Sequence, residues 1–265
     1  MDFGFSERQR EVQTLARQIL SREVSPEKLA AYDEYRLERF DAGLWGKLAE
    51  AGLLGVAVEE AYGGMGFGFT ELALLVEEMG RSIAPLPLLP HTVSAALPVQ
   101  KFGSATLKER LLPGVVGGTS LLTAGLLEPV VEDPSCPASV TASSDGDGYR
   151  VSGVKSCVPF AGSASRILIS ARTGTGVVAL LLDPTAPGVS RTAQQYTTFE
   201  PHCELSMNDA LVVAEDVLAG PENGAEVMRY ASLQTLAALC AHQVGVTDQA
   251  LRMTASYTSQ REQFG

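Results

Sequence analysis

The sequence predicts an α+β fold: an N-terminal α-helical bundle over residues 1–118, a middle antiparallel β-barrel or sandwich over 119–219, and the start of a second α-helical bundle over 220–265. Three observations lead to this prediction. The first region carries capping residues ahead of apolar residues at the helical period. The middle region breaks into short apolar runs between turn residues, and the last region keeps a helical spacing with no proline after Pro221.

Residues 1–80 predict four helices from their capping residues. Ser6, with Gln9 three positions later, matches a capping box, and apolar residues then recur every three or four positions. Further helices are predicted to begin at Pro26, after Asp41 and at Thr70, the last two ending near Gly52 and Gly80. In the fourth helix, Glu71, Glu77 and Glu78 lie opposite the apolar side, and we expect these acids to face water.

Residues 121–217 contain five short apolar or β-branched runs, which is typical of strands. The runs occupy 121–127, 149–153, 166–170, 177–183 and 211–217, and turn clusters lie at 144–148 and 184–188. In one run, Tyr149 and Val151 alternate with Arg150 and Ser152, which indicates a strand with one solvent-exposed face. No helical pattern of about 10 to 15 residues separates the runs, so we expect antiparallel pairing.

Residues 222 to 260 predict a single helix of about 55 Å, at 1.5 Å per residue. Apolar residues keep a helical spacing along it: Leu233, Leu236, Ala237, Cys240, Val244 and Leu251. The residues up to Gly265 provide no further helix to cover this face. We therefore expect either more polypeptide or another chain to cover it, and an apolar patch of this size favours an oligomer.

Composition excludes several classes of function. Of the 265 residues, 45% are hydrophobic, and 31 acidic against 20 basic residues give a net charge of −11. A phosphate backbone requires the opposite sign, so nucleic acid is not expected as a partner. The four cysteines form no CxxC pair, and the N-terminus lacks a signal-peptide pattern. Without a continuous apolar segment of about 18 residues, we expect no membrane insertion and a cytoplasmic location.

Motifs for other chemistries are incomplete. The glycine cluster at 63–68 matches neither a dinucleotide-binding nor a P-loop pattern, so we expect a loop between helices. The three histidines lie far apart in the sequence, and no serine stands in a G-x-S-x-G elbow, so neither a hydrolase triad nor a metal site is predicted. Near the C-terminus, Arg261 could pair with a phosphate through its planar guanidinium group, but by chemistry alone an ordinary helix end with a solvated arginine is the favoured interpretation.

The order of these regions, together with several local runs, resembles the acyl-CoA dehydrogenase family. The runs are FSERQ at 5–9, LLGVA at 53–57, YGGMG at 62–66, GYRVSGVK at 148–155 and YTSQREQFG at 257–265. The resemblance covers nearly the whole chain and implies a flavin enzyme that oxidises an acyl-CoA thioester to its α,β-enoyl form. In that family a glutamate removes the α proton, a hydride passes from the β carbon to FAD, and an electron-transferring flavoprotein reoxidises the flavin.

Two segments that contact flavin in the family depart from its pattern. Where the family has Thr-Glu-Pro-Gly-x-Gly-Ser-Asp, residues 127–134 read LEPVVEDP, and where it has Trp-Ile-Thr/Ser against the flavin ring, residues 157–159 read CVP. Some members carry their catalytic glutamate at the position of Thr235, and others carry it in a later segment that these 265 residues do not include. The resemblance therefore identifies no catalytic residue in this chain.

Arg261, Gln263 and Phe264 match the family motif that reaches across a subunit interface to a neighbour's FAD. This combination is similar to the actinobacterial heteromeric acyl-CoA dehydrogenases, including those of sterol side-chain degradation, in which two different chains share each flavin site. The leading interpretation is a partner chain of a heterotetramer, with the base and most flavin contacts on the other chain. Two alternatives remain: a self-sufficient homotetrameric dehydrogenase with divergent flavin contacts, and a structural or binding subunit that has lost flavin. The acyl group is not defined by these residues.

Overall fold

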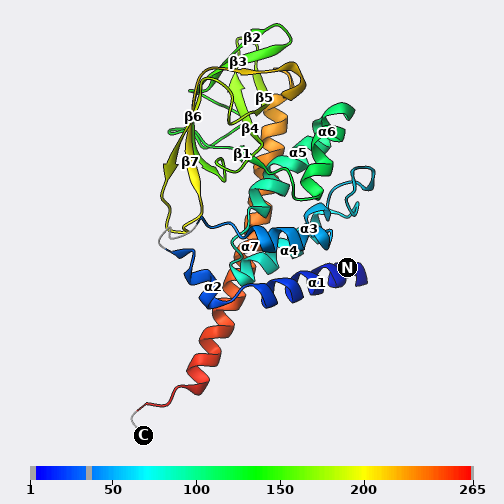
Figure 1. Ribbon diagram of the computed structural model, residues 1–265, viewed down its shortest axis with the longest axis vertical. Coiled ribbons are helices and arrows are strands. Elements are labelled where there is room, and N and C mark those ends of the chain that lie inside the picture. The colour runs from blue at the N-terminus through cyan, green and yellow to red at the C-terminus, as the bar shows by residue number, and fades with distance from the viewer. Residues whose placement is uncertain (1–3, 34–37, 264–265) are drawn as a thin grey trace.

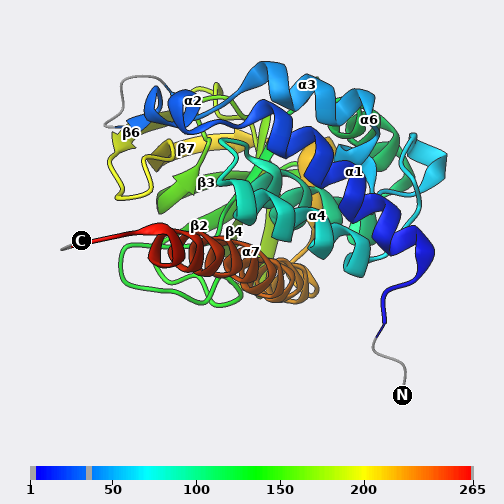
Figure 2. The ribbon, with the colours of Figure 1, turned by 90° about the horizontal axis from the view of Figure 1, so that it is seen from below.

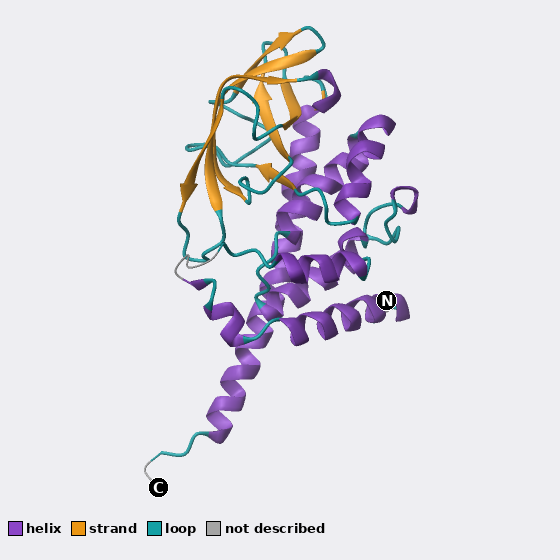
Figure 3. Cartoon of the chain, viewed as in Figure 1, coloured by secondary structure: helices purple, strands orange, loops and turns teal. Residues whose placement is uncertain are grey.

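The structure, a computed structural model, describes residues 4–33 and 38–263. Helices form the N-terminal part, a sheet forms the middle part, and one long helix follows (Figures 1 and 3). The helices are α1 (Glu7–Glu23), α2 (Pro26–Ala30), α3 (Ala42–Glu50), α4 (Phe69–Ser82), α5 (Leu97–Phe102), α6 (Ala105–Val116) and α7 (Gly224–Gln260), with a π-helical segment at Leu89–Ala96. This order confirms the predicted α+β class, while the domain boundaries at 118/119 and 219/220 stay predictions.

Side-chain caps begin the first three helices at the predicted positions. Ser6 Oγ accepts a hydrogen bond from the Gln9 N–H at 3.3 Å, and Gln9 Oε1 accepts one from the Ser6 N–H at 2.9 Å. Ser25 caps α2, and Asp41 Oδ1 accepts from the Leu44 N–H at the start of α3. Each cap satisfies an amide that lacks an intrahelical partner, and a cap of this kind contributes about 1 kcal/mol.

The prediction that Gly80 ends the fourth helix is wrong. Helix α4 continues to Ser82, and Ile83 after it adopts a left-handed conformation with φ 53°. A Cβ atom at Gly80 would lie 2.1 Å from the His242 carbonyl oxygen of α7, and one at Gly245 would lie 1.9 Å from the Glu77 carbonyl oxygen. The two glycines therefore allow α4 and α7 to approach closely, a tertiary requirement that helix-ending signals do not report.

The expectation that the acids of α4 face water is also wrong for Glu71 and Glu78. Glu78 is 1% exposed and accepts hydrogen bonds from Arg17 of α1 and from Arg81 of its own helix. Glu71 Oε2 accepts from the Gly68 N–H and so caps the start of α4. Both carboxylates are buried because α1 and α7 cover this side of α4, and the donors compensate their removal from water.

In the described part of the chain, the middle region forms an eight-stranded sheet in the order β6-β7-β3-β2-β4-β5-β8, with β1 beside β4. The strands are β1 (Leu122–Gly125), β2 (Thr141–Asp145), β3 (Gly148–Pro159), β4 (Arg166–Arg172), β5 (Val177–Leu182), β6 (Val189–Gln194), β7 (His202–Val212) and β8 (Val217–Ala219). The ladders are antiparallel except β1 with β4 and one pair between β2 and β4. The apolar runs missed β2 and β6 because these strands are mostly polar and exposed.

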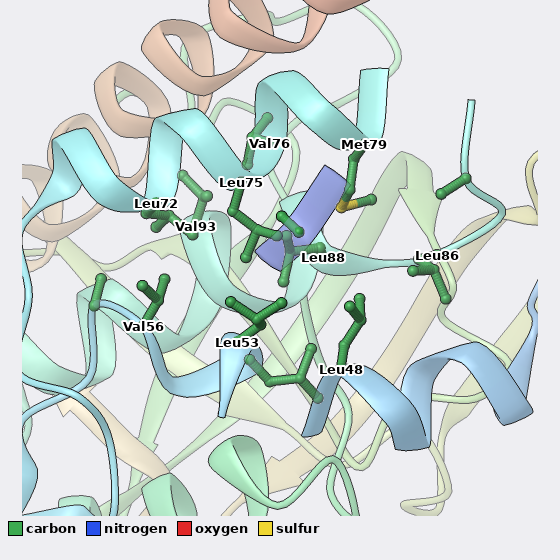
Figure 4. Close-up of a cluster of buried hydrophobic side chains, with 14 of the residues drawn as sticks. Leu48, Leu53, Val56, Leu72, Leu75, Val76, Met79, Leu86, Leu88 and Val93 are labelled. Atoms are coloured by element: carbon green, nitrogen blue, oxygen red, sulfur yellow. The ribbon is translucent and has the colours of Figure 1, made fainter. Parts of the chain in front are cut away.

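Buried apolar side chains form three clusters that join these parts. The first lies among α1, α3, α4 and the π-helical segment (Figure 4). The second fills the space between α6, β1 and the start of α7, and the third lies within the sheet. Figure 4 shows members of the first cluster, including Leu48, Leu53, Leu72 and Leu88, pointing toward one another. Full burial of one such leucine contributes about 1.5–3 kcal/mol.

Helix α7 has 37 residues and extends past the helical region as a projecting rod (Figure 1). Seen from below, it lies beside α4 (Figure 2). Its covered face uses small residues at seven-residue intervals: Ala231, Ala238 and Gly245. Val227 and Met228 are buried near its start, whereas the later apolar residues face outward, with Leu233, Leu236, Val244 and Leu251 between 54% and 68% exposed. The predicted uncovered apolar face is thus present. Among the described residues, no helix is long and apolar enough to cross a bilayer.

Candidate functional site

The structure brings together the two segments that depart from the family's flavin-contacting pattern. The Ser156 N–H donates to the Leu127 carbonyl oxygen at 3.0 Å, which joins the loop after β1 to the end of β3. Residues 127–139, here called the flavin loop, therefore border residues 157–159, here called the ring site. The family resemblance places contacts to the cofactor at residues 127–134 of this loop and at the ring site.

A buried ion pair anchors the flavin loop. Lys155 Nζ donates to Glu128 Oε1 at 2.9 Å and to Ser170 Oγ at 3.1 Å, and neither member of the pair is more than 5% exposed. Glu128 Oε2 accepts from the Ala138 and Ser139 amides and from the Ser139 hydroxyl, at 3.1, 2.7 and 2.8 Å. One carboxylate thus closes the loop at both ends. The sequence analysis missed this pair, for which the lysine in an otherwise half-buried strand was the only signal.

The electrostatics of Glu128 make it a structural anchor. Burial raises its pKa, but hydrogen bonds from Ser139 and Lys155 outweigh burial and lower the pKa to about 2. Burial lowers the pKa of Lys155, and the adjacent Glu128 carboxylate opposes this shift. A carboxylate that stays ionised and has both oxygens engaged is poorly suited to accept a proton from a substrate.

The polar groups of the ring site are bonded within the chain. Cys157 has φ 55°, its N–H donates to Gln194 Oε1 at 3.0 Å, and the Tyr196 hydroxyl contacts its Sγ. Pro159 has no N–H, and its carbonyl oxygen accepts from the Thr123 hydroxyl at 2.7 Å. Residues 157–159 carry no side-chain hydroxyl, and the Cys157 amide is already bonded to Gln194. The residues present therefore do not fit a flavin ring at this position.

Thr235 lies where α7 contacts the π-helical segment. Its hydroxyl donates to the Ala231 carbonyl oxygen at 2.7 Å and accepts from Ser94 Oγ at 2.8 Å. One of these hydrogen bonds stays within α7, and the other joins α7 to the π-helical segment. A threonine in this environment ties two helices together and has no accessible basic group.

Arg261 and Gln263 lie together just beyond the C-terminal end of α7, and both are exposed. The Arg261 guanidinium lies over the Tyr257 ring at 5.2 Å and contacts its hydroxyl. In the amide orientation that satisfies both groups, the Gln263 oxygen accepts from Arg261 Nε at 3.1 Å. Phe264 lies outside the described residues. The contacts of Arg261 within the described residues are therefore with the uncharged side chains of Tyr257 and Gln263.

The two halves of the predicted cofactor site are far apart in the fold. Figure 1 shows the end of α7 at one extreme of the long axis, with the sheet at the other. Arg261 and Gln263 therefore do not converge on the ring site of their own chain. Among the described residues, no group of three His, Cys, Asp or Glu side chains is placed to hold a metal ion.

Comparison with known proteins decides the family. Residues 6–119 match the family model described as "Acyl-CoA dehydrogenase, N-terminal domain". The whole chain is 33% identical over 264 residues to acyl-CoA dehydrogenase FadE27 of Mycobacterium tuberculosis and spans 68% of that protein. The chain belongs to the acyl-CoA dehydrogenase family. It is thus an acyl-CoA dehydrogenase-like protein, in agreement with the resemblance seen in its sequence.

Solved structures of this family share the fold. The ChsE4-ChsE5 complex of Mycobacterium tuberculosis has a TM-score of 0.91 at 31% identity, over 100% of this chain and 70% of that chain. A variant of the Tcur3481-Tcur3483 steroid acyl-CoA dehydrogenase has a TM-score of 0.88 at 40% identity, over 98% of this chain and 68% of that chain. The name of each of these two structures is a pair of different protein names. Family members bind FAD, as does the Bacillus anthracis enzyme, at 25% identity and a TM-score of 0.87 over 98% of this chain and 45% of that chain.

Proposed function

We propose that this chain is the non-catalytic subunit of a heteromeric acyl-CoA dehydrogenase and completes a FAD site held mainly by a second, related chain. Arg261, Gln263 and Phe264 would supply the contacts to that FAD. The observation that carries the proposal is the separation of the two half-sites. The groups that suit a neighbour's cofactor are exposed at the end of α7, while the ring site of the same chain is closed by its own side chains.

The chemistry of the α7 end supports this role. A guanidinium group offers a planar fork of donors that matches two phosphate oxygens, and Gln263 adds an amide beside it. The Tyr257 ring under Arg261 limits the conformations of that side chain before a ligand arrives. The loss of this arrangement would weaken binding of a pyrophosphate group in a neighbouring subunit.

The outer face of α7 supports an oligomer. Leu233, Leu236 and Leu251 are each more than half exposed, and they lie along one helix that projects from the rest of the chain. A stripe of this kind is unfavourable in water and marks an interface. The relatives named by pairs of chains favour a second family member as the partner.

In the proposed assembly, the reaction is the α,β-dehydrogenation of an acyl-CoA thioester, with an electron-transferring flavoprotein as the acceptor. FAD supplies the hydride-accepting chemistry, and the partner chain supplies the base. Neither Thr235, which is bonded to Ser94, nor Glu128, which is a buried anchor, can act as that base. This chain therefore contributes binding and orientation.

Flavin stoichiometry tests the proposal. The chain is purified alone and also co-expressed with its genomic neighbour, if that neighbour encodes a second family member, and the visible flavin absorbance per polypeptide is recorded. We expect no flavin on the lone chain and about one FAD per pair of chains in the complex. Stoichiometric FAD on the lone chain, together with dehydrogenation of an acyl-CoA, would identify a self-sufficient enzyme. A complex without flavin would identify a structural subunit.

A further inference from the structure

We infer that Gln194 and Tyr196, at the end of β6 and in the segment after it, close the ring site of this chain, so that no flavin ring lies against Cys157 in any assembly. This inference rests on the proposed function, since it names the residues that restrict the shared FAD to the other chain. It concerns the local structure around Cys157 and is testable separately from flavin stoichiometry.

The Cys157 amide is the first group that the closure engages. The register of β3 on β7 shifts between Lys155 and Val158, so Cys157 stands in a bulge whose N–H does not join the β3–β7 ladder. Such an amide is available to an external acceptor. Here Gln194, the last residue of β6, places its Oε1 at 3.0 Å from that nitrogen.

The Cys157 thiol is the second group that the closure engages. The Tyr196 hydroxyl contacts Sγ, and the Tyr196 ring packs on the His202 ring with centroids 4.4 Å apart. His202 pairs with both Pro159 of β3 and Gln194 of β6, so it fixes the tyrosine over the ring site from the sheet below. The hydroxyl of an aromatic residue of this chain therefore contacts the thiol at the position where the family has tryptophan.

Closure is the combined result of three strands. Gln194 comes from β6, His202 from β7 and Cys157 from β3, which are consecutive in the sheet. The Pro159 carbonyl oxygen of the ring site is engaged by Thr123 of β1. A flavin ring could enter only if Tyr196 left His202 and Gln194 released the Cys157 amide.

Thiol labelling tests the closure. The complex and the lone chain are treated with iodoacetamide, with and without saturating FAD, and the labelling rate of each cysteine is measured by mass spectrometry. Cys136 is exposed and serves as the reactive reference, whereas Cys203, on β7 beside Val158, reports any general loosening of the sheet. We expect Cys157 to react at least about tenfold more slowly than Cys136, with no effect of FAD.

Two variants assign the closure to Tyr196. Tyr196→Ala should raise the labelling rate of Cys157 about tenfold while Cys203 stays slow. Tyr196→Phe keeps the ring and should leave Cys157 protected. This second variant keeps the test decisive if the alanine variant does not fold. Protection of Cys157 by FAD, wild-type labelling as fast as that of Cys136, or an unchanged rate in a folded Tyr196→Ala protein would overturn the inference.

The two proposals fail differently. A complex with one FAD per pair of chains in which FAD protects Cys157 would retain the shared site and refute the closure. A complex without flavin in which Tyr196 still shields Cys157 would retain the closure and refute the proposed function.

Discussion

Lys155 and Glu128 form an ion pair with 2.9 Å between Nζ and Oε1, and both side chains are removed from solvent. The pair joins β3 to the flavin loop, and Ser170 extends it to β4. A buried pair of this kind is sensitive to the loss of one partner, because the other is left as an unpaired charge in a medium of low polarity.

Replacement of Lys155 by methionine should lower the free energy of unfolding by about 3–5 kcal/mol, because Glu128 then stays buried without its cation. Denaturant unfolding followed by circular dichroism measures the change. Arg150→Met is the matched control on the same strand, since Arg150 pairs with Asp145 at the surface, and it should have little effect. Equal effects of the two variants would show that the buried pair has no special role.

The Glu128 carboxylate makes the free energy of unfolding depend on pH. The pKa of Glu128 is lowered to about 2 from 4.5, so the unfolded chain binds the proton more readily. The stabilisation is therefore fully present above about pH 5 and is lost as the pH falls toward 2, in total about 3 kcal/mol. Unfolding free energies measured across this range should decrease, and Glu128→Gln should have a shallower slope. A wild-type slope retained in that variant would contradict the assignment.

His91 should make the free energy of unfolding depend on pH in a second range, above that of Glu128. Burial lowers its pKa to about 4, and its Nδ1 accepts from the Leu122 N–H at 3.0 Å, which requires the neutral ring. Because the folded pKa is depressed below 6.5, this stabilisation is present above about pH 6.5 and is lost as the pH falls through 4. His91→Gln should remove the dependence between these values. A titration of His91 by NMR above pH 6 would disagree with this prediction.

The glycine contact between α4 and α7 should tolerate no side chain. Gly80→Ala places a methyl group against the His242 carbonyl oxygen, and we expect destabilisation of about 1–3 kcal/mol or more. Gly46→Ala, in α3 with no atom within 4 Å of the added Cβ, is the matched control and should raise stability by about 0.5–1 kcal/mol. Thermal unfolding compares them. If both alanines raised the melting temperature, the close approach of the helices would be wrong.

Local signals in the sequence predicted local structure well. Ser6, Ser25 and Asp41 start their helices in the structure because a cap needs only residues two or three positions away. The run at 166–170 was found because β4 is buried and apolar, and the run at 149–153 was found because its residues alternate along a half-buried strand. The predicted uncovered apolar face of α7 is present, and beyond Met228 the buried residues of this helix are alanine and glycine.

Features that depend on distant residues were not predictable. The need for glycine at position 80 comes from α7, a helix that begins more than 140 positions later. Glu78 is buried because α1 and α7 cover it. The Lys155–Glu128 pair spans 27 positions, and the contacts of Gln194 and Tyr196 with Cys157 span 37 and 39. The site residues Arg261 and Gln263 were taken from a family motif; the structure places them together but leaves their role a prediction.

The FAD content of the Arg261→Ala complex is the most direct measure of whether this chain completes a flavin site on another chain. The variant and the matched control Arg252→Ala, which removes an exposed arginine paired with Asp248 on the same helix, are each co-expressed with the partner. Loss of the arginine–phosphate contact should weaken FAD binding about 5- to 150-fold, equivalent to about 1–3 kcal/mol, while the control retains its flavin. A wild-type FAD affinity in the Arg261→Ala complex would contradict the proposed function.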